Sequence, residues 1–466
     1  MLFRLAALCA LALDVSTSLA SPTTAIEPRL DRILAGATQK NGKPGIAVAI
    51  QRGSQVIYAK GFGYADVELR VPVTSETVFP VGSITKTMTG LAVTQLIVAG
   101  KIDLDAPAGK YVPGLPVPAR DALVRHLLNH TSGLVNYTEL PEFPRGAERP
   151  VTRAEVLGWF SAKPLQFEPG TRYNYTNSGT FLLGLIIEHV TGQSYDEYVR
   201  QNIFTPFGMQ HTSMADWRTL VSHRAHGYQR GKTGLVNAPR YDPLVAFSAG
   251  NAMSTTQDML KYRAGVFAGT ATPTAVRERL HQLDRLRDGT LVPYSLGCLV
   301  HVTLDGHRRI MHSGDISGFS AHYSYYPDDD TTIVVLTNSD SGVPPVSLEA
   351  KLARVVLGIA EPNRDEVPLS ESLGQRYAGN YTLGPITFGF TQMHFTYQNG
   401  VLSASFGRAH GDGPSLPLKH LGGGRFVSSL DDEHTFEFSG SGQQRRMVTH
   451  FYGGEFIATA GPPASP

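Results

Sequence analysis

One short stretch of the sequence carries a serine and a lysine at a spacing that permits nucleophilic catalysis. Ser83 and Lys86 stand in Val81-Gly82-Ser83-Ile84-Thr85-Lys86, at the predicted start of an apolar helix. Three residues of separation place both side chains on one helix face, one turn apart. A lysine whose pKa is lowered can take the proton of a serine hydroxyl. The start of the helix also offers backbone N–H groups to a developing oxyanion.

The Ser-x-x-Lys spacing is weak evidence on its own, because so short a pattern arises readily by chance. It occurs once in this chain. The alternative interpretation is that Ser83 caps the helix and Lys86 lies in solvent. A Gly-x-Ser-x-Gly elbow and a His-Glu-x-x-His zinc motif do not occur in the sequence, which excludes two other common hydrolase designs.

Further segments follow Ser83 in the order that one family uses. They are Phe79–Lys86, His126–Leu134, Pro169–Asn177 with its Tyr-x-Asn motif at Tyr175 and Asn177, Ile203–Met209, Ala249–Thr255, and His312-Ser313-Gly314 followed by Ser317-Gly318-Phe319. With these segments the sequence resembles the serine β-lactamase/penicillin-binding-protein superfamily, and within it the class C-like serine hydrolases. The resemblance covers roughly residues 26–358.

The resemblance implies an acyl-enzyme formed on Ser83, with Lys86 and Tyr175 sharing the proton transfers. This chemistry needs a neutral amine or a phenolate, so both groups should lie near positive charge or in a desolvated pocket. Asn177 is expected to donate a hydrogen bond to the substrate amide. The oxyanion is expected between the backbone N–H groups of Ser83 and Asp315. Taken alone, Tyr175 could equally be a packed aromatic residue.

The third motif departs from the best-known members of the superfamily, which carry Lys-Thr-Gly where this chain has His312-Ser313-Gly314. An ammonium group attracts a substrate carboxylate, whereas an imidazole is mostly neutral near pH 7. The departure disfavours strong β-lactam recognition. It suits the related esterases, D-aminopeptidases and β-lactamase-like peptidases, in which a histidine is common. Arg172 could supply positive charge instead. We expect His312, Gly314 and Asp315 to line the substrate site.

The elements that must position these residues are strands at both ends of the first 360 residues, with helices between them. The predicted strands are 46–50, 56–59, 310–312, 320–326 and 331–337, and the most apolar predicted helices are 85–99 and 181–190. This order indicates one sheet built from chain-distant pieces. We therefore predict an α+β fold, a β-lactamase/transpeptidase-like sheet with a helical insertion.

The chain of 466 residues is long enough for more than one domain. We expect a signal peptide at 1–20, a β-lactamase-like catalytic domain at 21–360 and a linker at 361–369. The remainder, 370–466, carries short predicted strands, the first at 386–390, and Gly- and Asp-rich turns separate several of them. This pattern predicts a C-terminal all-β domain, either a barrel or a sandwich. The sequence does not indicate its role.

Composition and the N-terminal segment limit the partners and the compartment. Lys plus Arg number 41 and Asp plus Glu number 40, with no basic run, so we expect no nucleic-acid partner. Residues 1–20 carry Arg4, an apolar core and Ser18-Leu19-Ala20, which is typical of a signal peptide. No later stretch is apolar enough to span a membrane. We expect an exported protein, either periplasmic in a bacterium or secreted.

Together these features predict a serine hydrolase that cleaves amide or ester bonds, with no metal or cofactor. His126 and His130 are four residues apart and could bind a metal, but their setting in a signature loop favours a structural role. Peptides containing D-amino acids lead the expected substrates of this peptidase or carboxypeptidase-like enzyme, followed by small esters and then β-lactams. The alternative from another class is a non-catalytic protein of the same fold, either a sensor of cell-wall peptides or a scaffold. The oligomeric state stays open.

Overall fold

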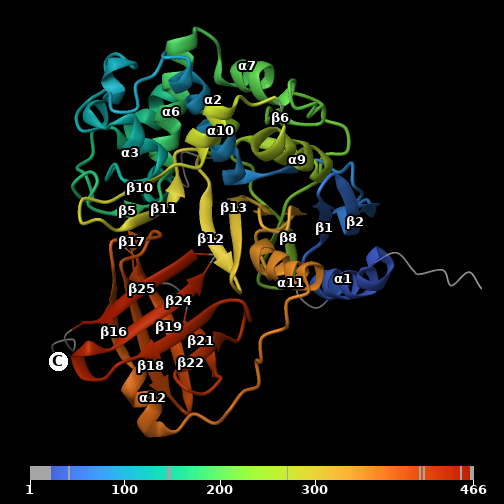
Figure 1. The fold of residues 1–466 in the computed structure, drawn as a ribbon, viewed down its shortest axis with the longest axis vertical. Helices are drawn as coiled ribbons and strands as arrows, with labels where there is room; N and C mark the ends of the chain where they lie inside the picture. Colours follow the sequence, from blue (N-terminus) through green and yellow to red (C-terminus); the bar gives the residue numbers. More distant parts are fainter. Residues whose placement is uncertain are drawn as a thin grey trace, which may run out of the picture.

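The computed structural model describes residues 22–39, 42–143, 148–269, 271–408, 411–412, 415–451 and 454–461. The predicted signal peptide lies outside these residues. An α+β domain occupies the first part of the chain, and a β-barrel follows it and lies against one end of the domain (Figure 1). No helix among the described residues is long and apolar enough to cross a membrane.

A nine-stranded antiparallel sheet, counted over the described residues, joins the two ends of the α+β domain. Its strands, in spatial order, are β10 (Leu283–Arg285), β11 (Leu291–Ser295), β12 (Val300–Leu304), β13 (His307–Ile316), β14 (Phe319–Tyr326), β15 (Thr331–Thr337), β1 (Gly45–Arg52), β2 (Gln55–Asp66) and β3 (Val71–Pro72). β1 pairs with β15, with Ile46 opposite Thr337. The predicted sheet of chain-distant pieces is therefore confirmed.

Strand β1 shows why the centre of this sheet is apolar on both faces. Ile46, Val48 and Ile50 pack with α1 (Pro22–Gln39) and α11 (Pro345–Leu357). The alternate residues, Ala47 and Ala49, belong to the core on the opposite face, which the helical region covers. Side chains alternate between faces along a strand, so an unbroken apolar run forms where helices cover both.

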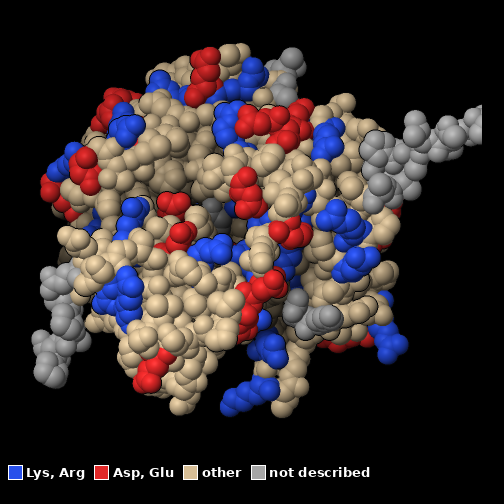
Figure 2. Space-filling model, turned by 60° about the horizontal axis from the view of Figure 1, so that its bottom comes forward, with Lys and Arg blue, Asp and Glu red and all other residues tan. Residues whose placement is uncertain are grey.

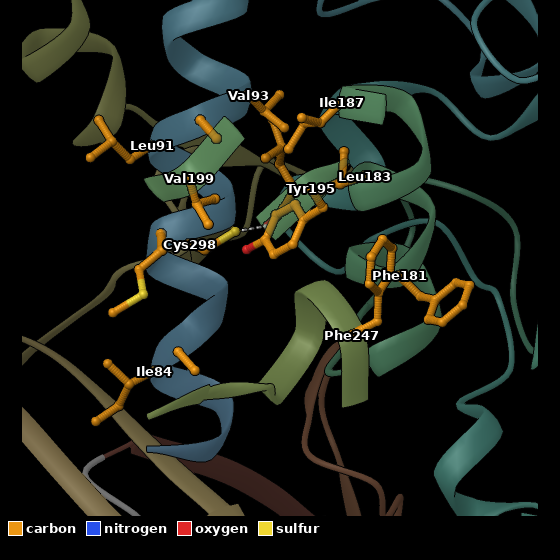
Figure 3. Close-up of a cluster of buried hydrophobic side chains, with 14 of the residues drawn as sticks. Ile84, Leu91, Val93, Phe181, Leu183, Ile187, Tyr195, Val199, Phe247 and Cys298 are labelled. Atoms are coloured by element: carbon orange, nitrogen blue, oxygen red, sulfur yellow. Dashed lines mark hydrogen bonds between the residues drawn. The ribbon is translucent and has the colours of Figure 1, made fainter. Parts of the chain in front are cut away.

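The helical region is built around α2 (Thr85–Val98), which is buried along most of its length. Helices around it include α6 (Asn177–Thr191), α7 (Tyr195–Val199), α8 (Pro243–Gly250) and α10 (Thr274–Leu280). Figure 3 shows side chains of α2 beside those of its neighbours: Leu91, Val93, Leu183, Ile187, Tyr195, Val199 and Phe247. A helix that is apolar all round must lie inside the protein. This burial fixes the position of the helix that follows Ser83.

Other helices of the region are α3 (Val124–Leu128) and α5 (Arg153–Phe160), and α9 (Thr256–Arg263) packs against β15 and β1 of the sheet. On the face drawn in Figure 2, acidic and basic side chains are interspersed over the described surface, as the balanced charge of the chain leads one to expect.

The C-terminal domain is a closed barrel, which decides between the two architectures that the sequence left open. Its strands, in spatial order, are β18 (Gln392–Gln398), β16 (Gly379–Leu383), β25 (Gly454–Ala460), β24 (Arg446–Phe451), β23 (Thr435–Ser439), β22 (Arg425–Ser428), β21 (Leu416–His420) and β19 (Val401–Arg408), and β18 pairs with β19 to close the ring. Phe395, Phe426, Phe436 and Met447 fill the interior. Helix α12 (Glu371–Tyr377) precedes the barrel and contacts β18.

One expected barrel strand belongs elsewhere. The sequence predicted a strand over 386–390, but β17 covers Ile386–Thr387 alone and pairs in parallel with β5 (Tyr173–Asn174) of the helical region. Tyr173 donates its backbone N–H to the carbonyl of Pro385 over 2.8 Å, and Thr387 Oγ1 donates to the Tyr173 carbonyl over 2.9 Å. The backbone of the Tyr-x-Asn segment is thus held by the barrel.

A second contact between barrel and catalytic domain is ionic. Arg354 of α11, only 3% exposed, pairs with Asp305 at 2.8 Å and with Glu433, in the loop between β22 and β23, at 2.6 Å. Nearby on α11, Lys351 pairs with Asp432 at 2.7 Å, but both of these side chains reach solvent.

The two ion pairs on α11 should differ strongly in their effect on stability. Replacing Arg354 leaves Glu433 without its buried partner, so we expect Arg354→Leu to lower the free energy of unfolding by about 3–5 kcal/mol. The matched variant Lys351→Leu breaks a solvated pair and should cost about 0–1 kcal/mol. Urea denaturation followed by far-ultraviolet circular dichroism measures both. Equal losses of unfolding free energy in the two variants would contradict a larger contribution of the buried Arg354 pair to the contact between the domains.

Candidate active site

Ser83 lies in a 3₁₀ turn, Gly82–Ile84, that leads directly into α2. Strand β13 lies against this turn because both partners carry glycine at the contact. Gly82 has a φ of +51°, and a Cβ there would stand 2.8 Å from the backbone nitrogen of Asp315. A Cβ on Gly314 would collide with the Val81 carbonyl and stand 2.8 Å from the nitrogen of Ser83. The backbone nitrogens of Ser83 and Asp315 therefore lie at the same close contact between the turn and the strand.

Lys86 is fully buried beneath Ser83. Its Nζ lies 3.0 Å from Ser83 Oγ, 2.7 Å from Asn177 Oδ1 and 2.7 Å from the Ala249 carbonyl. Burial lowers the pKa of Lys86 to about 7, because a charged amine loses its hydration there. A substantial fraction of Lys86 is therefore neutral at neutral pH.

These three contacts fix the direction in which a neutral Lys86 points its lone pair. The Ala249 carbonyl and the Asn177 amide oxygen can only accept hydrogen bonds. A neutral amine carries two hydrogens and one lone pair, so the two oxygens take both hydrogens. The lone pair then faces Ser83 Oγ, and the hydroxyl proton of Ser83 can pass to it.

Tyr175 stands on the other side of the serine hydroxyl. Its ring centre lies 4.9 Å from Lys86 Nζ, and its hydroxyl interacts with the Ser83 side chain. Burial raises the pKa of Tyr175 well above its ordinary value, an effect that the hydrogen bond with Ser83 opposes only in part. The sequence left a phenolate or a neutral amine open as the base. In the structure, burial keeps the hydroxyl of Tyr175 protonated and lowers the pKa of the Lys86 amine.

Asn177 is held by the start of α6, which begins at this residue. Thr176 caps the helix by accepting from the N–H of Ser178, and the N–H of Asn177 donates to Asn136 Oδ1 over 3.1 Å. The side-chain nitrogen of Asn177 donates to Thr138 Oγ1 over 2.9 Å. An amide nitrogen has two hydrogens, so a second one is available for a substrate.

His312 of the third motif lines the same site but differs from a lysine in more than its shape. Burial, with a contribution from the charge of Lys86, lowers the pKa of His312 to about 3. Its Nδ1 lies 2.5 Å from the Ser313 carbonyl, and its Nε2 lies 2.8 Å from the Tyr294 hydroxyl. The ring is neutral, and both of its nitrogens already have partners.

Two hollows meet at Ser83. The larger, about 650 Å³, is lined by Ser83, Asn177, Asp315 and several aromatic residues, among them Tyr137, Trp217, Tyr241 and Phe319. The smaller, about 220 Å³, shares those three residues and adds Tyr175, Tyr294, His312, Ser313 and Phe388. Arg172, the cation considered from the sequence, lines neither hollow. Arg224 and Arg240 line the larger one and stack on Trp217.

His130, which the sequence offered as a possible metal ligand, packs among aromatic side chains beside the site. His130 is fully buried and packs against Tyr173, Tyr175 and Tyr294. Its Nδ1 accepts the backbone N–H of Thr176 over 3.3 Å, which helps to place the Tyr-x-Asn segment. His130 therefore supports the site as a packing residue.

Phe388 is a site residue that sequence reasoning missed. It follows β17, and its ring centre lies 5.1 Å from that of Tyr175. The barrel thus supplies part of the wall of the catalytic pocket. The apolar run Ile386–Phe390 was visible in the sequence, but its pairing with β5 joins residues more than two hundred positions apart, and no local pattern encodes such a pairing.

The fold and the side chains gathered around Ser83 are those of the serine β-lactamase/penicillin-binding-protein superfamily. The sequence profile of the family described as Beta-lactamase matches residues 30–358. The chain belongs to this family, as its motifs predicted.

Individual relatives agree with the assignment. The chain is 25% identical over 359 residues to "Penicillin-binding protein 4*" of Bacillus subtilis, an alignment that covers 72% of this chain and 79% of the relative. An octameric penicillin-binding protein homologue from Pyrococcus abyssi superposes with a TM-score of 0.66 at 25% identity, over 92% of this chain and 99% of the other. A D-stereospecific amidohydrolase from Streptomyces has a TM-score of 0.62 at 25% identity, over 72% and 99%.

The position of Phe388 can be tested by truncation. Phe388→Ala removes the ring that covers Tyr175, so we expect KM for an aromatic p-nitrophenyl ester to rise on the order of tenfold, with kcat changing less. Phe388→Leu keeps most of the apolar contact and should stay within about threefold of the unmodified protein. Steady-state kinetics of all three proteins decide the matter. Unchanged KM in Phe388→Ala would contradict a role for the barrel in the pocket.

Proposed function

We propose that the protein is a serine hydrolase that cleaves amide or ester bonds through an acyl-enzyme on Ser83. The observation that carries the proposal is the set of contacts at Lys86 Nζ, which lies within hydrogen-bond distance of Ser83 Oγ, the Ala249 carbonyl and Asn177 Oδ1. A buried lysine of lowered pKa does not by itself indicate catalysis. Because Lys86 Nζ also contacts Ser83 Oγ, the two residues meet the requirement for nucleophilic catalysis.

The proposed reaction follows from the groups around Ser83. Lys86 takes the hydroxyl proton while Ser83 Oγ attacks the substrate carbonyl. The N–H groups of Ser83 and Asp315 stabilise the oxyanion. Tyr175, as a phenol beside Ser83, passes a proton to the leaving group and recovers one from Lys86. Water then enters, and the same groups act in reverse to release the acid.

Small substrates containing D-amino acids are the proposed class. The larger hollow is lined by aromatic rings together with a few polar groups, which is the common character of a small-molecule site. A relative named a D-stereospecific amidohydrolase shares the fold over 99% of its length. Small esters are the second class, because the same acyl-enzyme chemistry applies to them.

Two alternatives have less support. Efficient β-lactam hydrolysis would require a cation for the substrate carboxylate, and neutral His312 stands where related enzymes hold a lysine. A silent sensor of cell-wall peptides would not require a neutral lysine aimed at a serine. Export to the periplasm or the medium remains a proposal that rests on the sequence of residues 1–20 alone.

The acyl-enzyme is tested by a mass shift. The protein incubated with a fluorophosphonate probe should gain one adduct on Ser83, detected by intact-mass and peptide-mass analysis. Ser83→Ala should gain none and should lose hydrolysis of p-nitrophenyl esters on the order of 10⁴-fold or more. Ser372→Ala, a change at an exposed serine of α12, is the matched control and should behave as the unmodified protein. An adduct elsewhere, or an active Ser83→Ala, refutes the proposal.

A further inference from the structure

The middle residue of the third motif, Ser313, has a partner that the proposed mechanism does not use. Ser313 is partly exposed and lines the smaller hollow. It stands opposite His322 in the pairing of β13 with β14, and Ser313 Oγ lies 2.8 Å from His322 Nδ1. His322 is completely buried. Which of the two groups donates this hydrogen bond depends on the tautomer of the imidazole.

A buried carboxylate decides the tautomer. Glu349 of α11 lies with Oε2 3.6 Å from His322 Nε2 and 3.0 Å from Arg309 Nη1. Burial alone would raise the pKa of Glu349, but Arg309, helped by the histidine, lowers it to about 2. Because Glu349 is ionised, a hydrogen on His322 Nε2 is attracted to it, whereas a lone pair there would be repelled.

His322 therefore carries its hydrogen on Nε2 and leaves Nδ1 bare. Burial also lowers the pKa of His322, which keeps the ring neutral at pH 7. The bare Nδ1 can only accept, so the Ser313 hydroxyl donates its single hydrogen inward, to His322. What Ser313 retains for the substrate hollow is the acceptor capacity of its oxygen.

The hydrogen-bond partners of His312 decide its tautomer in the same way. The Ser313 carbonyl can only accept, so the hydrogen of His312 lies on Nδ1, and Nε2 accepts from the Tyr294 hydroxyl. Neither side chain of this motif then offers a positive charge or a donor hydrogen to the substrate. A carboxylate placed against these two side chains would receive no hydrogen bond from them, and such a group loses affinity when its hydrogen bonds to water are not replaced.

Strand geometry places the side chains of His312 and Ser313 beside the bond that is cleaved. The pairing of β13 with β12 ends at Met311, so the β12-side edge of His312–Ile316 has no partner in that pairing. An extended substrate can lie along such an edge. With its carbonyl oxygen at the Asp315 N–H, the neighbouring atoms of the substrate lie near Ser313, two residues earlier on the strand.

We propose that Ser313 accepts a hydrogen bond from a substrate N–H, and that the site therefore selects substrates with a neutral carboxamide over those with a free carboxylate beside the scissile bond. This inference rests on the proposed function. It makes the enzyme an endo-acting peptidase for D-amino-acid derivatives and disfavours carboxypeptidase action. Ser313 is the specificity-determining residue. His322 and Glu349 are positioning residues, because they decide that the Ser313 hydroxyl donates inward and accepts from the substrate.

The test uses two substrates that differ in one group, N-acetyl-D-alanyl-D-alanine and its C-terminal carboxamide. We expect kcat/KM for the carboxamide to exceed that for the acid on the order of tenfold or more, mainly through KM. If the enzyme does not hydrolyse one of the two compounds, both are instead compared as inhibitors of p-nitrophenyl ester hydrolysis. The ratio of their inhibition constants then replaces the ratio of kcat/KM. Equal values, or a preference for the acid, would overturn the inference.

Variants identify the source of the preference. Ser313→Ala should reduce the ratio to about one, and Ser313→Thr, which keeps the hydroxyl, should retain it. His322→Phe frees the hydroxyl to donate and should shift the ratio toward the acid, with thermal unfolding used to verify the fold. A ratio unchanged in Ser313→Ala would place the selection at another group and overturn the assignment. Failure of the unmodified protein to hydrolyse any ester would instead contradict the proposed function itself.

Discussion

Desolvation of Lys86 is the constraint on which the site depends. An amine in water keeps its proton at neutral pH, whereas the buried amine of Lys86 has a pKa of about 7. The burial is produced by α2, which other helices surround and which the sheet covers at its N-terminal end. Two carbonyl-type oxygens then supply hydrogen-bond partners without supplying a counter-charge. A carboxylate in either place would stabilise the ammonium and remove the base.

The same need for a dry, ordered pocket explains the contact between the two domains. The barrel pairs β17 with β5, and β5 precedes Tyr175 directly in the chain. Phe388 covers the Tyr175 ring, and exclusion of water on that side raises the pKa of Tyr175 and keeps it a phenol. The barrel, whose role the sequence left open, is in this account part of the catalytic pocket.

Much of the fold and part of the site could be predicted from the sequence. The Ser-x-x-Lys spacing led to Ser83 and Lys86, and the family resemblance implied Tyr175 and Asn177. The structure brings these four residues together, because each lies at the start of a helix or beside a short strand with strong local signals. Phe388, Tyr294 and His322 could not be found in this way. Phe388 reaches the site through a pairing between distant strands. Tyr294 and His322 act through side-chain hydrogen bonds to His312 and Ser313, and the sequence around them is typical of an ordinary apolar strand. The charge state of His312 was foreseen, but not that both of its nitrogens have partners.

The dependence of acylation on pH tests the central claim most directly. If neutral Lys86 is the base, kcat/KM for a p-nitrophenyl ester should rise about tenfold per pH unit below neutrality and level off above a midpoint near pH 7. Tyr175→Phe should be slower but keep this midpoint, and Lys86→Ala should lose both the rate and the midpoint. A midpoint near the ordinary lysine value of about 10, or a Lys86→Ala variant with the unmodified profile, would contradict the account.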